Sequence, residues 1–243
     1  MRFDQNTFSR MIINRQQQRW VRKTHRFLGL FLGLQFLMWT VSGLYFSWSD
    51  IDQIHGDDFK KSPAEHVAFD LPKLDAAKLG MPIHALSLRT IDGEPYYWIN
   101  DSILVEAYTG QITPGIDKDQ AVAVAQAHLK PLGTIDSVYQ IEAVGPHHEV
   151  RGADFPVYAI AFQHPDHPVA YVSQKDGRFL SIRHQNWRWF DFLWMTHTMD
   201  YEGRDDFNTT LLRAFSFLGL ITVLSGFALW AVTTTVFKRK NAQ

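Results

Sequence analysis

Residues 27–48 have the sequence FLGLFLGLQFLMWTVSGLYFSW, and residues 214–237 have the sequence AFSFLGLITVLSGFALWAVTTTVF. Neither stretch contains a charged residue. Each is longer than the roughly 20 residues that an α-helix needs to cross a hydrocarbon core about 30 Å thick. Because a segment inside a bilayer must satisfy its own backbone hydrogen bonds, both stretches are predicted to be transmembrane helices.

Two other interpretations of these stretches are weaker. A secretory signal peptide has a shorter apolar region followed by a small-x-small cleavage site, and the first stretch has neither feature. As a buried core helix, the second stretch would be longer than most helices of small domains. We therefore expect two spans and no cleavage.

The charged residues predict the orientation of the two spans. Seven basic residues and one acid precede the first stretch, and three basic residues follow the second. Between the stretches, residues 49–206 hold 13 basic and 24 acidic residues. Since basic flanks are retained in the cytoplasm, both termini are expected inside a bacterial cell, with the acidic segment beyond the inner membrane. The chain is thus expected to be a multi-pass inner-membrane protein embedded in the lipid bilayer.

This reasoning divides the chain into five parts. They are a basic cytoplasmic N-terminus (1–26), a first transmembrane helix (27–48), a periplasmic region (49–206), a second transmembrane helix (207–237) and a cytoplasmic tail (238–243). A formal net charge of -1 argues against a nucleic-acid-binding protein. The absence of cysteine excludes disulfides, iron–sulfur clusters, thiolate-ligated haem and c-type haem.

The periplasmic region contains two copies of one pattern, a helix followed by three strands, over residues 70–115 and 116–183. In the first copy Asp70 caps the helix, and Asp92-Gly93 forms a hairpin turn. In the second copy Asp117 caps the helix, with Gln120 at the capping-box position. Strands are expected at residues 84–90, 94–100, 103–108, 137–144, 155–162 and 169–173.

The two copies align best after their third strand. Residues 105–112 (VEAYTGQI) and 172–179 (VSQKDGRF) share the pattern V-x-x-x-[TD]-G-x-[IF], with glycine where a turn needs positive φ. Residues 187–200 follow as an amphipathic helix at the outer membrane surface. The predicted fold class is therefore two transmembrane helices plus an α+β periplasmic domain made of two α-β-β-β repeats.

These motifs resemble those of the PepSY-associated transmembrane proteins. Residues 171–177 (YVSQKDG) are similar to the Y-V-x-x-x-T-G signature of the PepSY domain, a small α+β module, with Asp176 in place of Thr. Residues 187–201 (WRWFDFLWMTHTMDY) are similar to the W-R-x-F-D-x-L-W-x-x-H-x-M-D segment of the family. HRFLGL at 25–30 and WTVSGLY at 39–45 resemble its first span, and Ser225-Gly226 resembles the closing motif of its last.

The resemblance implies a haem-containing membrane electron carrier with PepSY-like repeats. Larger relatives have four spans and act as inner-membrane ferric-siderophore reductases, with b-type haems held by histidines. The resemblance thus implies haem b as the cofactor, with His25 and His197 as the cofactor-binding residues and haem iron ligands. This chain departs from the pattern in having two spans, so either it forms a homodimer that rebuilds a four-helix bundle or it lacks the redox function.

His25 lies directly before the first predicted span. On a helix, Gly29 and Gly43 project in nearly the same direction, with Gly33 close by. Imidazole can ligate iron, and the missing side chains leave room for a flat macrocycle. A second interpretation stays open, because Gly29-x-x-x-Gly33 also lets two membrane helices pack closely and His25 can belong to the basic flank.

His197 shares a helix face with Trp187, Phe190 and Trp194. It is either an axial iron ligand near the periplasmic side or the polar edge of an interfacial aromatic belt. From His25 to Trp48 the first helix extends roughly 35 Å, so the two histidines are expected near opposite faces of the membrane and cannot share one iron. A symmetric homodimer would supply a second ligand to each iron.

The leading hypothesis for function is an inner-membrane haem b protein that carries electrons toward periplasmic ferric compounds, as a ferric reductase does. The alternatives are a non-enzymatic PepSY protein that binds or regulates a periplasmic protein partner, and an accessory subunit of iron-chelate uptake. His147-His148 and His164 with His167 are weaker candidates for binding a metal or a ferric chelate. The chain has no P-loop, dinucleotide fingerprint, nucleophile elbow or H-E-x-x-H motif, so kinase, NAD-binding and protease functions have no support.

Overall fold

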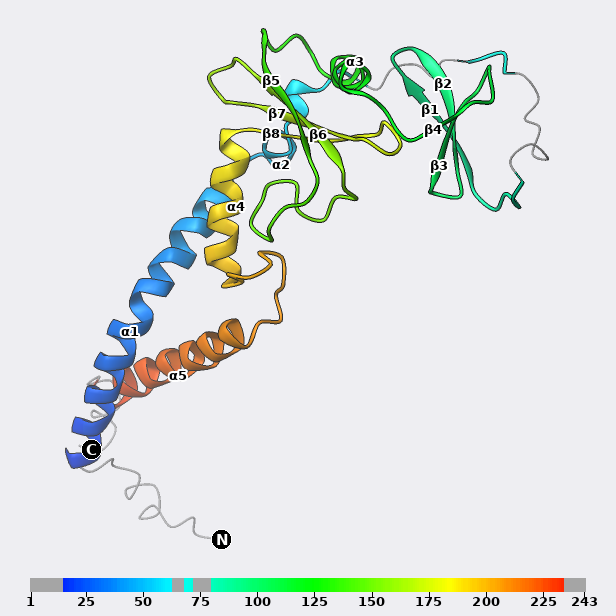
Figure 1. The fold of residues 1–243 in the computed structure, drawn as a ribbon. Helices are drawn as coiled ribbons and strands as arrows, with labels where there is room; N and C mark the ends of the chain where they lie inside the picture. The colour runs from blue at the N-terminus through cyan, green and yellow to red at the C-terminus, as the bar shows by residue number, and fades with distance from the viewer. Residues whose placement is uncertain (1–14, 63–67, 72–79, 234–243) are drawn as a thin grey trace. The chain divides into compact units, whose positions relative to one another are not determined.

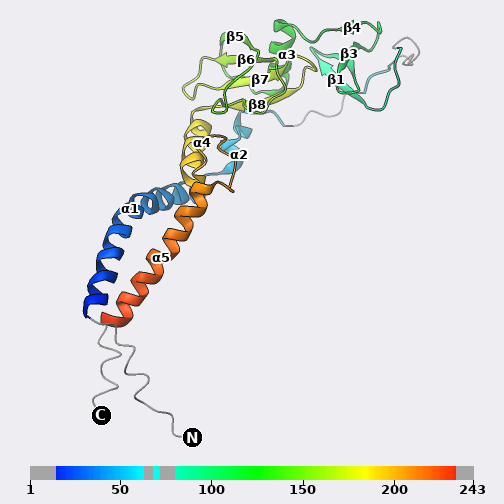
Figure 2. The same ribbon diagram turned by 60° about the horizontal axis from the view of Figure 1, so that its bottom comes forward.

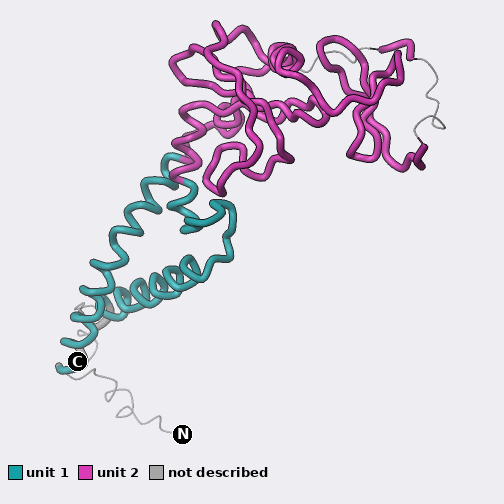
Figure 3. The backbone as a smooth tube through the Cα atoms, viewed as in Figure 1, with its two compact units in different colours: residues 1–45, 194–243 teal, residues 46–193 magenta. Residues whose placement is uncertain are grey.

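The computed structural model describes residues 15–62, 68–71 and 80–233, which form two compact units. Unit 1 comprises residues 1–45 and 194–243, and unit 2 comprises residues 46–193 (Figure 3).

Unit 1 is built from helices. It contains most of α1 (Arg15–Trp48), the end of α4 (Gln185–Thr198) and all of α5 (Thr210–Thr233) (Figure 1). Two helices of the described residues are long and apolar enough to cross a membrane, over Arg19–Trp48 and Thr210–Trp230. α1 and α5 run antiparallel, because His25 lies against Gly226 whereas Phe36, further along α1, lies against Gly219 (Figure 2).

Unit 2 holds two antiparallel sheets of four strands, each with its strands in chain order. The first consists of β1 (Leu86–Ile91), β2 (Glu94–Ile99), β3 (Ile103–Glu106) and β4 (Ile112–Thr113). The second consists of β5 (Ile135–Ile141), β6 (Val157–Phe162), β7 (Val169–Ser173) and β8 (Phe179–Arg183). Three shorter elements belong to the same unit, namely α2 (Ile51–Ile54), the 3-10 helix η2 (Asp57–Phe59) and α3 (Lys118–His128).

The prediction of three strands per copy is wrong, because each sheet has a fourth strand. β4 has two residues, which are too few to show an alternating pattern. β8 begins with the adjacent apolar residues Phe179 and Leu180, so it also lacks strict alternation. The helix predicted for the first copy falls largely on residues 72–79, which lie outside the described residues. That the two copies are PepSY repeats stays a prediction.

The repeated signature forms two turns of matching geometry, each between the third and fourth strands of a sheet. Gly110 has a φ of 74° and Gly177 a φ of 66°, as predicted for both. Their amides donate to the carbonyl oxygens of Glu106 and Ser173, at 2.9 and 3.0 Å respectively. The same local sequence therefore produces the same chain reversal in both sheets.

Helix α3 packs against both sheets and shares their core. Its capping box is formed as predicted, since Asp117 Oδ1 accepts from the Gln120 amide at 2.9 Å and Gln120 Oε1 accepts from the Asp117 amide at 3.0 Å. One buried cluster joins α3 and the strands of both sheets; it includes Ile91, Tyr96, Trp98, Leu104, Val124, Ile160, Val172 and Ile182. This common core ties the two sheets into one unit.

Gly177 lies where the two sheets meet. A Cβ at this position would be 2.7 Å from both Cγ1 and Cδ1 of Ile91, and 3.3 Å from Cγ2 of Ile116. Ile91 is completely buried, so its side chain has little room to move away. At Gly110, by contrast, an added Cβ would meet no described atom within 4 Å. Gly177 therefore allows Ile91 and Ile116 to approach its backbone closely, in addition to forming the turn.

Gly177→Ala is expected to destabilise the protein more than Gly110→Ala. Both place alanine at positive φ, which costs about 1–2 kcal/mol. Only Gly177→Ala also overpacks the core, which adds about 1–3 kcal/mol. Urea unfolding of the full chain in detergent, followed by tryptophan fluorescence, measures both losses. Equal losses would contradict the packing role of Gly177.

Asp200 organises the loop of unit 1 that precedes α5. Its side chain is buried, and its carboxylate accepts from the amides of Glu202, Gly203 and Asp206, at 3.2, 3.0 and 2.8 Å respectively. The bonds from Asp206 and Gly203 lower the pKa of Asp200, against the opposing effect of burial. The loop therefore depends on an ionised carboxylate.

We expect this loop to open in acid. The folded pKa of Asp200 lies below the unfolded value of about 3.9, so its stabilisation is complete above that value and is lost as the pH falls through the folded pKa. Asp200→Asn should weaken the loop by about 1–3 kcal/mol at neutral pH, because a neutral amide accepts more weakly than a carboxylate. Hydrogen exchange of the Gly203 and Asp206 amides measures both effects. Exchange that is unchanged in Asp200→Asn, with Glu202→Gln as the control, would show that the carboxylate does not hold the loop.

Candidate functional site

His25 and His197 each contact a serine on another helix of unit 1. Nδ1 of His25, on α1, lies 2.8 Å from Oγ of Ser225 on α5. Nδ1 of His197, on α4, lies 2.8 Å from Oγ of Ser42 on α1. Both histidines predicted from the sequence therefore have the same kind of partner through the same ring nitrogen.

One edge of the His25 ring faces a glycine of α5. A Cβ at Gly226 would be 3.3 Å from Cε1 and 4.0 Å from Nε2 of His25, so this edge of the ring lies against a glycine. Gly226 also lines a hollow of about 440 Å³ together with Val223, Phe227 and Trp230. Gly226 thus both meets the His25 ring and lines this apolar hollow.

The setting of His197 is fixed by side chains of α1. The Trp39 indole donates to the His197 carbonyl at 2.8 Å, and the Gln35 amide donates to the Thr196 carbonyl at 3.3 Å. The last carbonyl groups of a helix have no partner within it, and here α1 supplies partners for the end of α4. Burial lowers the pKa of His197, which favours the neutral imidazole.

The structure does not bring the two histidines together. Ser42, the partner of His197, lies 17 residues beyond His25 on α1, which corresponds to about 25 Å of helix. Unit 1 therefore has two separate histidine levels, one formed by His25 with Ser225 and the other by His197 with Ser42.

The glycines predicted to leave room beside His25 face open space within the described part of the chain. An added Cβ at Gly29, Gly33 or Gly43 would meet no described atom within 4 Å. The glycines that receive aromatic rings belong to α5 instead, with Phe36 at 3.1 Å from an added Cβ at Gly219, and His25 at Gly226.

Haem b fits the chemistry of these residues. Among the described residues no group of three or more His, Cys, Asp or Glu side chains is placed to hold a metal ion. A haem brings its own ring nitrogens and needs from the protein only axial ligands and an apolar setting. If haem were bound, His25 and His197 would be the residues that hold it, one at each level. One chain supplies a single histidine at each level.

The first half of α4 is attached to the second sheet within unit 2. Arg188 donates twice to Glu149, at 2.6 and 3.0 Å, and the Tyr171 hydroxyl donates to the same carboxylate at 2.6 Å. Burial and this carboxylate raise the pKa of Tyr171, so its phenol stays protonated and remains a donor. Arg151 pairs with Asp191 at 2.8 Å. The W-R-x-F-D part of the aromatic segment therefore serves to dock the helix.

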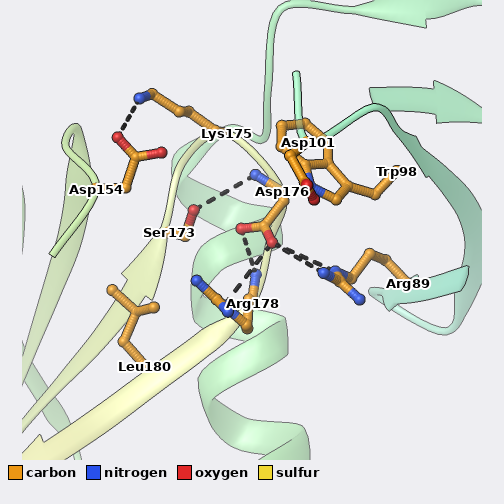
Figure 4. Close-up of a pocket in the computed structure, with 9 residues that line it drawn as sticks. All are labelled: Arg89, Trp98, Asp101, Asp154, Ser173, Lys175, Asp176, Arg178 and Leu180. Atoms are coloured by element: carbon orange, nitrogen blue, oxygen red, sulfur yellow. Dashed lines mark hydrogen bonds and ion pairs between the residues drawn. The ribbon is translucent and has the colours of Figure 1, made fainter. Parts of the chain in front are cut away.

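A cleft of about 210 Å³ lies between the two sheets of unit 2 (Figure 4). Arg89 and Arg178 reach the buried Asp176 carboxylate, at 3.3 and 3.8 Å respectively, and Lys175 pairs with Asp154. Because the cations that line the cleft are paired with acids of the same unit, no surplus positive charge is presented to an anionic ligand. Asp176 connects the first sheet to the β7–β8 turn, which is a structural role.

Two of the four weaker histidine candidates, His148 and His164, stabilise turns. His148 Nδ1 accepts from the Val150 amide, and His164 Nδ1 accepts from the Asp166 amide, both at 3.2 Å. Neither belongs to a metal-binding group in the ranges that the structure describes.

The sequence reasoning missed Ser42 and Ser225 as site residues, although both were part of the motifs. Each is a hydroxyl residue that precedes a glycine inside a charge-free span. Hydroxyl side chains in membrane helices often bond across to a neighbouring helix, and this was the available signal. Asp200 was also missed, although it matches the last Asp of the H-x-M-D motif.

One of the comparisons with known proteins identifies the family of the chain. No curated protein and no solved structure gives a significant match to the chain. The family model described as the PepSY-associated TM region matches residues 2–232, which is almost the whole chain. The serine-bound histidines thus lie in segments that the family model covers, and the chain is a membrane protein that belongs to the PepSY-associated transmembrane family.

Proposed function

We propose that the protein is an inner-membrane haem b protein that carries electrons across the membrane toward periplasmic ferric compounds. The observation that carries the proposal is the pair of serine-bound histidines, His25 with Ser225 and His197 with Ser42. A histidine that ligates a metal commonly donates its other ring N–H to an oxygen, and each of these histidines has Nδ1 at 2.8 Å from a serine oxygen. When bound, haem supplies reversible one-electron exchange at its iron.

The chain's own residues support transfer between the two faces of the membrane. The two histidine levels are about 25 Å apart along α1, which is most of a hydrocarbon core about 30 Å thick. At the His25 level, Val223, Phe227 and Trp230 line an apolar hollow. Histidine ligands at these two depths would hold one haem near each face of the membrane.

The proposed active form is a homodimer. Each chain has one candidate ligand per level, and a two-fold axis would pair His25 with its mate and His197 with its mate. The open faces of Gly29 and Gly33 leave space for a macrocycle or for a helix of the second chain.

The proposed orientation follows from charge. Because basic flanks are retained in the cytoplasm, the proposed topology has both termini in the cytoplasm and residues 49–206 in the periplasm. His25 then belongs to the cytoplasmic side and His197 to the periplasmic side, where a ferric compound would receive electrons.

The spectrum of the protein purified from haem-replete cells tests the proposal. We expect a reducible Soret band with split α and β bands, and about one haem per chain for two haems in a dimer. His25→Ala and His197→Ala should each reduce this to about half, and the double variant should be colourless.

His84→Ala, which removes an exposed histidine of unit 2, is the matched control and should retain the full haem content. A colourless wild-type preparation would exclude the haem function and favour the non-enzymatic alternative, in which the PepSY-like region binds or regulates a periplasmic partner. Full haem content in the double variant would show that other residues are the ligands.

Single-cysteine labelling tests the orientation, since the chain has no cysteine of its own. A membrane-impermeant maleimide should label Ala127→Cys, on the exposed side of α3, in intact cells. Arg19→Cys, in the basic segment before the charge-free residues 27–48, should be labelled only after lysis. The reverse result would invert the proposed topology.

A further inference from the structure

The hydroxyl groups of Ser42 and Ser225 are bonded on two sides. Besides its histidine, Ser42 Oγ lies 2.6 Å from the Met38 carbonyl oxygen. Ser225 Oγ lies 2.7 Å from the Thr222 carbonyl oxygen. A carbonyl oxygen can only accept, so each serine donates its single proton to its own helix.

The direction of the serine hydrogen bonds determines which ring nitrogen of each histidine carries a hydrogen. Because each serine proton is already used, the Oγ atom can only accept from imidazole, and Nδ1 must carry the hydrogen. A neutral imidazole with hydrogen on Nδ1 has its lone pair on Nε2, which is the form that ligates a metal. The opposite tautomer would place two lone pairs against each other across 2.8 Å.

We infer that Ser42 and Ser225 are positioning residues that hold His197 and His25, respectively, in the Nδ1–H tautomer with the Nε2 lone pair available to a ligand. The link to haem rests on the proposed function, whereas the tautomer itself rests on the hydrogen bonds.

Burial makes the effect strongest at Ser42. This residue is 1% exposed, so water has no access to replace its hydroxyl if the side chain is truncated. A buried N–H without an acceptor is costly, and the imidazole is expected to change tautomer or orientation instead. The serine therefore acts through the histidine and touches no reacting atom itself.

The tautomers can be observed without haem. The full chain, labelled with ¹⁵N-histidine and purified in detergent from haem-depleted cells, is studied by long-range ¹H–¹⁵N correlation at about pH 8, well above the ordinary histidine pKa of about 6.5. Correlations lost in His25→Gln and His197→Gln identify the two rings. We expect a protonated Nδ1 and an unprotonated Nε2 for both.

Truncation of each serine should affect only its own histidine. Ser42→Ala should remove the Nδ1–H pattern of His197 and leave that of His25, and Ser225→Ala should do the converse. The unaffected ring reports that the variant is folded. Thr40→Ala and Thr222→Ala are matched controls, because these hydroxyls donate only to carbonyls of their own helices, Phe36 and Leu218.

Haem titration into the same preparations gives the second measurement. Loss of a hydrogen bond to a ligating histidine typically weakens metal binding by about 10–100-fold, so Ser42→Ala and Ser225→Ala should each weaken one site by this factor. Ser225→Thr keeps the hydroxyl and should restore both the tautomer and the affinity.

The outcomes separate this inference from the proposed function. A wild-type protein with hydrogen on Nε2 of either ring would overturn the inference, whether or not haem binds. So would serine variants that change neither tautomer nor haem affinity. Serine-dependent Nδ1–H tautomers in a protein that binds no haem would support the positioning role and overturn the haem function.

Discussion

Polar groups on membrane helices must find partners within the protein, since hydrocarbon offers none. In unit 1 this constraint is met in two ways. Ser42 and Ser225 donate to carbonyls of their own helices, and Trp39 donates to the carbonyl at the end of α4. The bond from Trp39 also fixes the position of His197, because the indole that donates to its carbonyl holds its backbone beside α1. Hydrogen bonds to backbone carbonyls thus position the side chains of both histidine levels.

The two histidine levels repeat one arrangement on different elements. In each, a hydroxyl that is already bonded to its helix receives an imidazole from another helix, and a glycine follows the serine in the chain. Neither level gathers enough side chains to hold a bare ion among the described residues. Such levels suit a group that brings most of its own ligands, as haem does.

In unit 2 the residues of the family-like motifs serve packing and attachment. Gly177 permits the close approach of the two sheets, and Asp176 links Arg89 of the first sheet to the turn of the second. Arg188 and Asp191 attach α4 to partners in the same unit. The aromatic segment therefore combines two tasks, because its first half docks the helix and its second half carries His197.

The sequence by itself determined the features that depend on composition or on near neighbours. Two charge-free runs identified the long apolar helices, Asp117 and Gln120 formed the expected capping box, and Gly110 and Gly177 took the expected turns. The tertiary structure alone decided the partners of the histidines, which lie 200 and 155 positions away in the chain. It also decided which glycines meet aromatic rings and added the fourth strand to each sheet. The reason is physical: a cap or a turn is set by residues a few positions apart, whereas these contacts depend on how whole helices and strands pack.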